Sequence, residues 1–193
     1  MIKAKNRPCP VCEDDYMPFQ SFQKCCPKPA CANEMGKRVN KAKLDKKHRK
    51  EKTEYRLKTK SISAWIKEAQ IEVNAYVRLR DHHLNCVSCD RSPEDTHLRG
   101  SAFHAGHYRG RGASPNLRYN LHNIRKQCAY CNEHLSGNVV EYRKELINRI
   151  GIDKVEALEI NNGYRKFTKE YCIRVKAIFK KKASMKKKFL GLD

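Results

Sequence analysis

The chain contains two Cys-x-x-Cys pairs, Cys86/Cys89 and Cys128/Cys131, with 38 residues between them. A two-residue gap lets both thiolates of a pair face one ion, and two such pairs complete a tetrahedral shell. One isolated pair would also be compatible with a redox site, whereas two pairs around a histidine-rich segment indicate zinc. We therefore expect these four cysteines to bind a structural zinc ion.

A second set of five cysteines lies in a proline-rich stretch near the N-terminus: Cys9, Cys12, Cys25, Cys26 and Cys31. We expect four of the five to hold a second zinc ion. Cys26 is favoured over Cys25 because the stretch is similar to small zinc modules that read Cys-x-x-Cys, an aromatic and proline segment, Gln-Lys-x-Cys and a final Cys. The gap to Cys31 is longer than in those modules, so both choices stay open.

The composition limits the size of the core and the kind of partner. Only 39% of the residues are hydrophobic, and mean hydropathy is −0.84, so bound metal is expected to replace missing core. The 42 Lys and Arg against 21 Asp and Glu give a net charge of +21, which favours nucleic acid as the partner over an anionic membrane. The sequence shows neither a membrane span nor a secretory signal, so we expect a cytoplasmic protein with reduced cysteines.

Changes in composition divide the chain into four segments. Residues 1–36 form a loop-rich zinc-binding module, and residues 37–60, with 12 Lys and Arg, form a basic helix or a disordered linker. Residues 61–160 contain the second cysteine set with flanking helices. Residues 161–193 form a C-terminal helix and a basic tail, whose lysines are expected to be mobile.

Apolar periodicity predicts helices on both sides of the second cysteine set. The first begins near Ser61 or Ser63, the next ends at Gly151, Asp153 caps a short helix, and the last begins at Thr168. The core-facing residues of the first helix are expected to be Ile66, Ala69, Val73, Tyr76 and Val77, with Trp65 beside this face. Those of the last are Tyr171, Val175, Ile178 and Phe179. The isolated Cys172 is expected to be a buried apolar residue and not a ligand.

Several polar residues recur at fixed distances from the second cysteine set. His107 lies 18 residues after Cys89, Asn123 lies five residues before Cys128, and Asn132 directly follows Cys131. The segments that carry these residues and their neighbours are Ser63-Ala-Trp-Ile-Lys-Glu-Ala-Gln70, Asn74-Ala-Tyr76, Ala105-Gly-His-Tyr108, Asn123-Ile-Arg-Lys-Gln-Cys128, Cys131-Asn-Glu-His134 and Ser136-Gly-Asn138.

Together these segments resemble the phage NinG (Rap) family, recombination endonucleases of the HNH superfamily that act on branched DNA. The likeness covers residues 61–160 well and the N-terminal module loosely. It implies an α+β, zinc-stabilised ββα-metal (HNH-like) nuclease core with flanking helices and a small N-terminal cysteine-rich zinc module. In such a core a β-hairpin and a helix, pinned by a zinc knuckle, surround one catalytic Mg²⁺ or Mn²⁺.

The resemblance also assigns roles to individual residues. His107 matches the general base, for which a neutral imidazole with a pKa near 7 is expected. Asn123 matches the residue that braces the hairpin loop, and Asn132 matches a ligand of the catalytic metal. The implied products carry 5′-phosphate and 3′-hydroxyl ends.

The second ligand of the catalytic metal departs from the family pattern. Many HNH enzymes have an acidic residue directly before the base, where this chain has Gly106. Strand alternation places His104 on the same face as that position, and an imidazole there would favour Mn²⁺, Co²⁺ or Ni²⁺. His134 is an alternative ligand, and His97 and His122 are expected to be structural or surface residues.

Three arginines around His107 are expected to bind DNA phosphates: Arg109, Arg111 and Arg118. For Arg111 a solvated flexible loop is an equal alternative.

The predicted function is structure-selective cleavage of Holliday junctions or D-loops, by a possible homodimer formed through the 61–83 helix. The alternatives are an HNH nicking endonuclease on ordinary duplex DNA and a non-catalytic zinc-dependent DNA-binding recombination mediator. An RNA-binding zinc protein is disfavoured because only 8% of the residues are aromatic.

Overall fold

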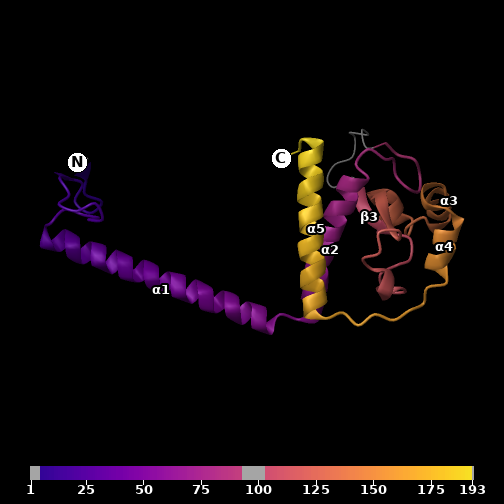
Figure 1. The fold of residues 1–193 in the computed structure, drawn as a ribbon, viewed down its shortest axis with the longest axis horizontal. Coiled ribbons are helices and arrows are strands. Elements are labelled where there is room, and N and C mark those ends of the chain that lie inside the picture. Colours follow the sequence, from indigo (N-terminus) through magenta and orange to yellow (C-terminus); the bar gives the residue numbers. More distant parts are fainter. Residues whose placement is uncertain (1–4, 93–102, 193) are drawn as a thin grey trace. The chain divides into compact units, whose positions relative to one another are not determined.

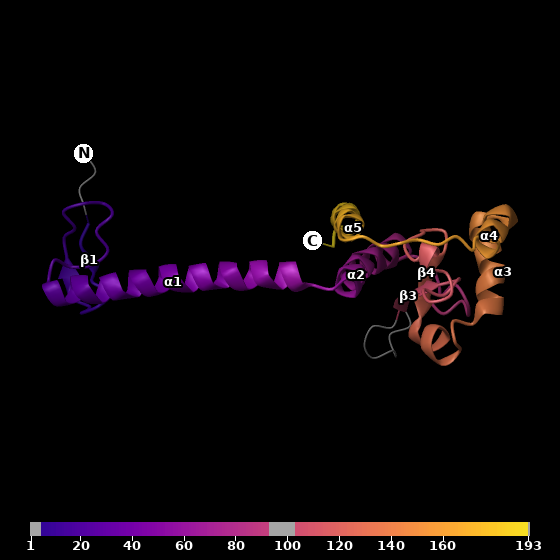
Figure 2. The same ribbon diagram turned by 90° about the horizontal axis from the view of Figure 1, so that it is seen from below.

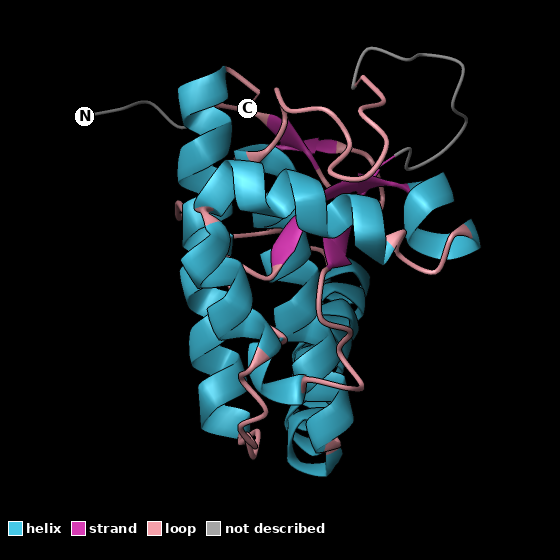
Figure 3. Cartoon of the chain, turned by 90° about the vertical axis from the view of Figure 1, so that its right-hand side faces the viewer, coloured by secondary structure: helices cyan, strands magenta, loops and turns pink. Residues whose placement is uncertain are grey.

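A computed structural model describes residues 5–92 and 103–192 of the chain (Figure 1). The chain folds into two compact units, Met1–Lys60 and Ser61–Asp193. Figure 3 shows that helices and short strands make up the described chain, which is therefore a mixed α+β protein, as predicted. None of the helices within the described ranges is both long and apolar enough to cross a membrane.

The N-terminal unit consists of a small hairpin and one long helix. Strand β1 (Arg7–Pro8) pairs antiparallel with β2 (Asp15–Tyr16). Helix α1 (Pro29–Thr59) begins with proline, whose fixed φ suits the first turn of a helix. The helix therefore starts inside residues 1–36, which were predicted to be loop-rich. It also covers residues 37–59, so the predicted basic segment is a helix and not a disordered linker. Of its residues only Cys31 is buried, so α1 is solvated on all sides beyond its first turn.

Helix α2 (Ile62–Arg80) forms the centre of the second unit. The Ser61 hydroxyl caps it by accepting a hydrogen bond from the Ala64 amide at 3.3 Å. The predicted apolar stripe is confirmed as core, because three of its five residues are buried and two are partly buried, and the neighbouring Trp65 is buried as well. The stripe packs against α5 (Lys169–Leu190), which lies alongside α2 in Figures 1 and 2, and it is therefore occupied within the chain.

Helix α5 begins after Thr168 as predicted, with the Thr168 hydroxyl accepting from the Tyr171 amide at 3.2 Å. Cys172 is buried in the core, also as predicted, whereas Ile178 is 45% exposed and lies off the packed face. The prediction of a mobile lysine tail is wrong, because the helix continues to Leu190. Ala183 extends the buried face, and the Lys182 ammonium lies 5.4 Å from the centre of the Phe179 ring.

A two-stranded antiparallel sheet lies between the helices of this unit. Strand β3 (Phe103–His107) pairs with β4 (Ile124–Cys128), with Phe103 opposite Cys128 and His107 opposite Ile124. One side of the sheet joins the α2–α5 core, and on the other side lie α3 (Val139–Ile150) and α4 (Ile152–Glu159) (Figure 2). Gly151, at φ 86°, ends α3 as predicted. It also precedes α4, so Asp153 lies in the first turn of that helix and does not cap it.

An arginine–aspartate pair fixes α2 to β4. Arg80 donates to the carbonyl oxygens of Leu121 at 3.1 Å and Ile124 at 2.7 Å. The buried Asp81 carboxylate accepts from Arg80 at 2.6 Å and from the Lys126 amide at 3.1 Å. These bonds hold the end of α2 at the start of β4 and so set the position of the neighbouring hairpin residues.

Candidate functional site

The four cysteines of the second unit converge as the sequence predicts. The sulfur atoms of Cys86, Cys89, Cys128 and Cys131 all lie within 4.8 Å of one another. Backbone amides point at the cluster, since the Cys86 sulfur accepts from the Cys128 amide at 3.2 Å and from the Ser88 amide at 3.4 Å. Zinc binds cysteine as the thiolate, whose sulfur can accept hydrogen bonds of this kind. Four sulfurs from two knuckles fit a closed, structural zinc site.

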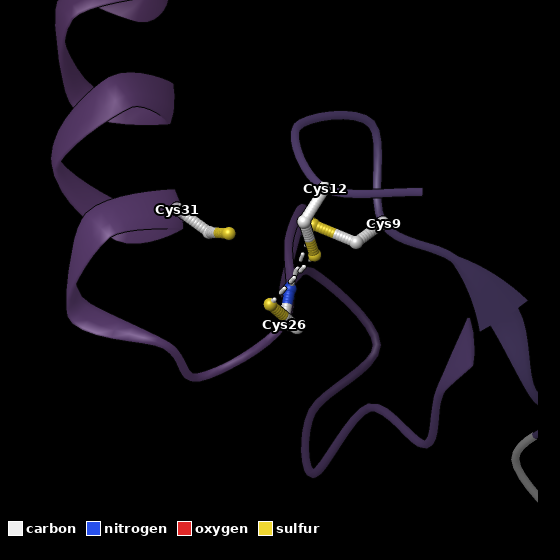
Figure 4. A group of neighbouring side chains, drawn as sticks. All are labelled: Cys9, Cys12, Cys26 and Cys31. Atoms are coloured by element: carbon white, nitrogen blue, oxygen red, sulfur yellow. Dashed lines mark hydrogen bonds between the residues drawn. The ribbon is translucent and has the colours of Figure 1, made fainter. Parts of the chain in front are cut away.

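A second cluster lies in the N-terminal unit (Figure 4). It consists of Cys9, Cys12, Cys26 and Cys31, again with all sulfur atoms within 4.8 Å of one another. Cys25 is buried nearby but is not a member, so the preference for Cys26 is confirmed. Burial would raise the pKa of Cys9, but backbone hydrogen bonds, led by the one with Cys26, together lower it to about 6. This cluster also fits a four-cysteine zinc site.

A polar cleft of about 480 Å³ opens along β3. It is bounded by α2, by β3 and the loop that follows it, and by the short π-helical turn Tyr130–His134. Three of the four residues predicted to act at the catalytic centre line it: His104, His107 and Asn132. The other lining residues are Asn74, Arg78, Ala105, Gly110, Arg111, Glu133, Ser136 and Gly137.

His107 ends β3, and its ring is fixed by the backbone. The Nε2 atom lies 3.0 Å from the Arg118 carbonyl oxygen. Because a carbonyl oxygen only accepts, Nε2 carries the proton of the neutral ring and Nδ1 carries the lone pair. Burial lowers the pKa of His107 to about 4, against the opposing effect of the Arg118 hydrogen bond. The ring is thus neutral at physiological pH, but its pKa is well below the expected value near 7.

Asn123, the fourth predicted residue, is fully buried behind the cleft. Its Oδ1 accepts from the Arg109 amide at 2.7 Å, and its Nδ2 donates to the carbonyl oxygens of Arg109 at 3.0 Å and Leu117 at 3.3 Å. One side chain therefore ties together both ends of the loop between His107 and Arg118.

His104 meets two groups of the π-helical turn. Its Nδ1 lies 3.2 Å from Nδ2 of Asn132 and 3.2 Å from Oε1 of Glu133. A half-turn of the Asn132 amide about its last side-chain bond would exchange its oxygen and nitrogen. Oδ1, which is a suitable metal ligand, would then lie beside His104 Nδ1. Imidazole, amide and carboxylate together form a donor set that divalent cations accept. Among the described residues, the groups of three or more His, Cys, Asp or Glu that could share one ion are the two cysteine clusters. The cleft set differs from them, because one of its three members is an amide.

Glu133 was missed by the sequence analysis. The family pattern has its carboxylate on the strand directly before His107, whereas Glu133 lies in the π-helical turn. Its place directly after Asn132 was the available signal, because neighbouring residues in one tight turn reach the same cleft.

The geometry explains why position 106 carries no acid. A Cβ atom on Gly106 would lie 2.1 Å from Oε1 and 2.9 Å from Cβ of the buried Gln127. The Gln127 side chain is itself held by hydrogen bonds from Nε2 to Ser88 Oγ at 2.8 Å and to the Gly137 carbonyl oxygen at 2.6 Å. No side chain fits at Gly106 without displacing this group.

The three predicted phosphate-binding arginines differ in their surroundings. Arg111 is exposed and lines the cleft. Arg118 is partly buried, with its guanidinium 5.9 Å from the Phe167 ring centre, and Arg109 hydrogen-bonds Ser114 at 3.3 Å and Asn162 at 3.5 Å. The exposed Arg78 of α2, which the sequence analysis did not single out, lies at the cleft with Arg111.

The other three histidines of the sequence-based prediction do not line the cleft as the structure describes it. His134, the alternative ligand, is exposed and packs near the Tyr130 ring, outside the cleft lining. His122 is exposed, and His97 lies outside the described residues.

The chain is similar to phage proteins over most of its length. The model of a family described as Bacteriophage Lambda NinG protein matches residues 1–188. Protein ninG of Escherichia phage 933W is 38% identical over 195 aligned residues, which cover 94% of each chain.

Two further relatives match over a shorter stretch. Protein ninG of Escherichia phage lambda is 46% identical over 127 residues, covering 66% of this chain and 59% of the relative. Protein ninG of Salmonella phage P22 is 44% identical over 127 residues, covering 66% and 60%. No solved structure matches. On the match to residues 1–188, the chain belongs to the NinG family of bacteriophage proteins.

Proposed function

We propose that this protein is a metal-dependent, HNH-type DNA endonuclease that cleaves branched recombination intermediates such as Holliday junctions and D-loops. The observation that carries the proposal is the neutral His107 ring, held by the Arg118 carbonyl in a cleft that it shares with His104 and Asn132. A protein that only binds DNA needs no such oriented base.

His107 would act through Nδ1, because Nε2 is committed to the Arg118 carbonyl. Nδ1 accepts a proton from water as the water oxygen forms a bond to the scissile phosphorus. The bond from phosphorus to the 3′ oxygen breaks, and this oxygen takes a proton from solvent water, which leaves a 3′-hydroxyl and a 5′-phosphate. Asn123 keeps the loop that carries the Arg118 carbonyl in register with β3, and so positions the ring.

The cleft offers residues for the catalytic cation. His104, Asn132 and Glu133 would hold it, with Glu133 supplying the carboxylate that position 106 cannot accommodate. A bound Mg²⁺ or Mn²⁺ supplies positive charge that stabilises the pentavalent phosphate and the leaving oxygen.

DNA binding is supported by charge. The net charge of +21 favours phosphate contacts along the chain. Arg78 and Arg111 at the cleft are suited to the phosphates that flank the cut. The two symmetric cuts of a four-way junction require two active sites, so we propose a homodimer. Its contact must use a surface other than the packed stripe of α2.

The test compares labelled four-way, forked and linear DNA of matched sequence, incubated with the intact protein and Mg²⁺ or Mn²⁺. We expect severalfold faster cleavage of branched DNA, with nicks that DNA ligase can reseal because they carry 5′-phosphates. Equal rates on all three DNAs would favour a nicking endonuclease on ordinary duplex. DNA binding without cleavage under either metal would favour a non-catalytic recombination mediator.

A further inference from the structure

The N-terminal unit exposes two aromatic side chains on one turn. Phe19 is 85% exposed and Phe22 is 75% exposed, and Met17 beside them is 61% exposed. The small core buries three of the clustered cysteines together with Cys25 and Tyr16, and the fourth, Cys12, is partly buried against it. Single exposed apolar residues are ordinary, but two large rings three residues apart, on a unit with so little core, indicate a binding surface.

Hydrogen bonds brace the turn that carries the rings. Gln23 makes most of these bonds. Its side-chain Oε1 accepts from the Phe19 backbone amide at 2.9 Å, and its own backbone amide donates to the Gln20 carbonyl at 3.1 Å. Gln23 Nε2 donates to the Cys25 carbonyl at 2.8 Å, and Cys25 directly precedes Cys26 of the cysteine cluster. The Tyr16 hydroxyl donates to the Gln23 carbonyl at 3.2 Å. The rings are therefore presented on a preorganised turn, which lowers the entropy cost of binding through them.

The excess of basic residues in the N-terminal unit indicates the kind of partner that it binds. Residues 5–60 contain sixteen Lys and Arg against seven Asp and Glu, and most of these basic residues lie on the solvated helix α1. An apolar protein surface would gain nothing from this excess, whereas a nucleic-acid strand offers phosphates for the cations and base faces for the rings. Bases in an intact duplex are stacked on each other, so only unpaired bases can receive Phe19 and Phe22 without an unstacking cost.

We propose that Phe19 and Phe22 form a stacking platform for the unpaired bases of single-stranded DNA, while basic side chains of α1 contact its phosphates. The inference rests on the DNA partner of the proposed function, but not on cleavage. It gives the N-terminal unit the task of recognising exposed bases such as those at a branch point.

The test uses the full chain with Phe19 and Phe22 both replaced by Leu, and separately both replaced by Trp. Leucine keeps apolar bulk but has no π face, whereas tryptophan keeps the stacking face. Phe189→Leu, at an 80% exposed position on α5, is the matched control. Binding to labelled oligothymidine and to blunt duplex is measured by fluorescence anisotropy without added Mg²⁺ or Mn²⁺, and native mass spectrometry checks that zinc is retained.

We expect the double Leu variant to lose about tenfold or more in affinity for oligothymidine, with unchanged duplex affinity and unchanged salt dependence. The double Trp variant and Phe189→Leu should bind like the parent. Parental binding by the double Leu variant would overturn the proposal, as would an equal loss on duplex. A lower mass in solution for the double Leu variant than for the parent would show that the rings form a contact between two copies of the chain. This result would also overturn the proposal.

A spectroscopic measurement covers the case in which the double variants lose zinc. The single native tryptophan, Trp65, is buried, so Phe22→Trp adds an exposed reporter. Oligothymidine should quench its fluorescence, and an unquenched signal at saturating DNA would contradict stacking. Quenching by a protein that cleaves no DNA would overturn the proposed nuclease alone.

Discussion

The Nε2 atom of His107 lies 3.0 Å from the carbonyl oxygen of Arg118. This contact joins the end of β3 to the far end of the following loop, and Asn123 holds the same loop from inside. It fixes the tautomer of the imidazole and directs its lone pair to Nδ1. A partly buried ring held in this way should affect stability as well as chemistry.

The first prediction concerns pH. Burial lowers the pKa of His107 from 6.5 to about 4, so between these values the unfolded chain binds a proton that the folded chain does not. Stability is therefore lost as pH falls through this window and is unaffected above it. We expect the parent to lose about 1–2 kcal/mol more than His107→Gln between about pH 7 and about pH 5. Urea unfolding of both proteins measures this, and protonation of the zinc thiolates cancels in the comparison. Equal losses in the two proteins would contradict a low pKa for the His107 ring.

The second prediction concerns the close approach of Gly106 to Gln127. A methyl group at Gly106 must displace the buried Gln127 side chain, so Gly106→Ala should destabilise the protein by about 1–3 kcal/mol. Gly110→Ala is the control, because nothing lies within 4 Å of its added Cβ. Urea midpoints compare the two variants, and equal stability would mean that Gln127 moves aside without cost.

The third prediction separates two adjacent cysteines. Cys26 belongs to the N-terminal cluster and Cys25 does not. Cys26→Ser should therefore lose one of two bound zinc ions in native mass spectrometry, whereas Cys25→Ser should keep both. Loss of one zinc ion in Cys25→Ser but not in Cys26→Ser would make Cys25 the ligand. An unmodified protein that binds no zinc would contradict both proposed zinc sites.

The fourth prediction concerns the cation held in the cleft. Glu133→Gln removes a ligand charge and should weaken Mn²⁺ binding by about tenfold or more, measured by calorimetry on zinc-loaded protein. Glu141→Gln is the control, because Glu141 pairs with Lys144 at 2.8 Å and lies outside the cleft lining. Unchanged Mn²⁺ affinity would mean that Glu133 contacts His104 without binding the cation.

Local signals were sufficient to place most of the helices. Ser61, Gly151 and Thr168 act through bonds within a few residues, so their sequence context predicts their structural roles. The cysteine clusters were also predictable, because one zinc ion restricts the spacing of its ligands.

Features that depend on distant partners could not be read from the sequence. The lysine-rich end of α5 looked like a mobile tail because its packing partner, α2, lies about a hundred residues earlier. The low pKa of His107 depends on burial by the assembled fold. Glu133 reaches His104 only because the turn after Cys128 brings it to β3.

The most direct test of the account is the separation of binding from cleavage in His107→Ala. Its affinity for a four-way junction and its two zinc ions should match those of the parent, because the ring contacts neither cluster. Its cleavage rate with Mg²⁺ or Mn²⁺ should fall by about a hundredfold or more, the usual effect of losing a general base. Cleavage by His107→Ala at the parental rate would contradict the central claim that this imidazole activates the attacking water.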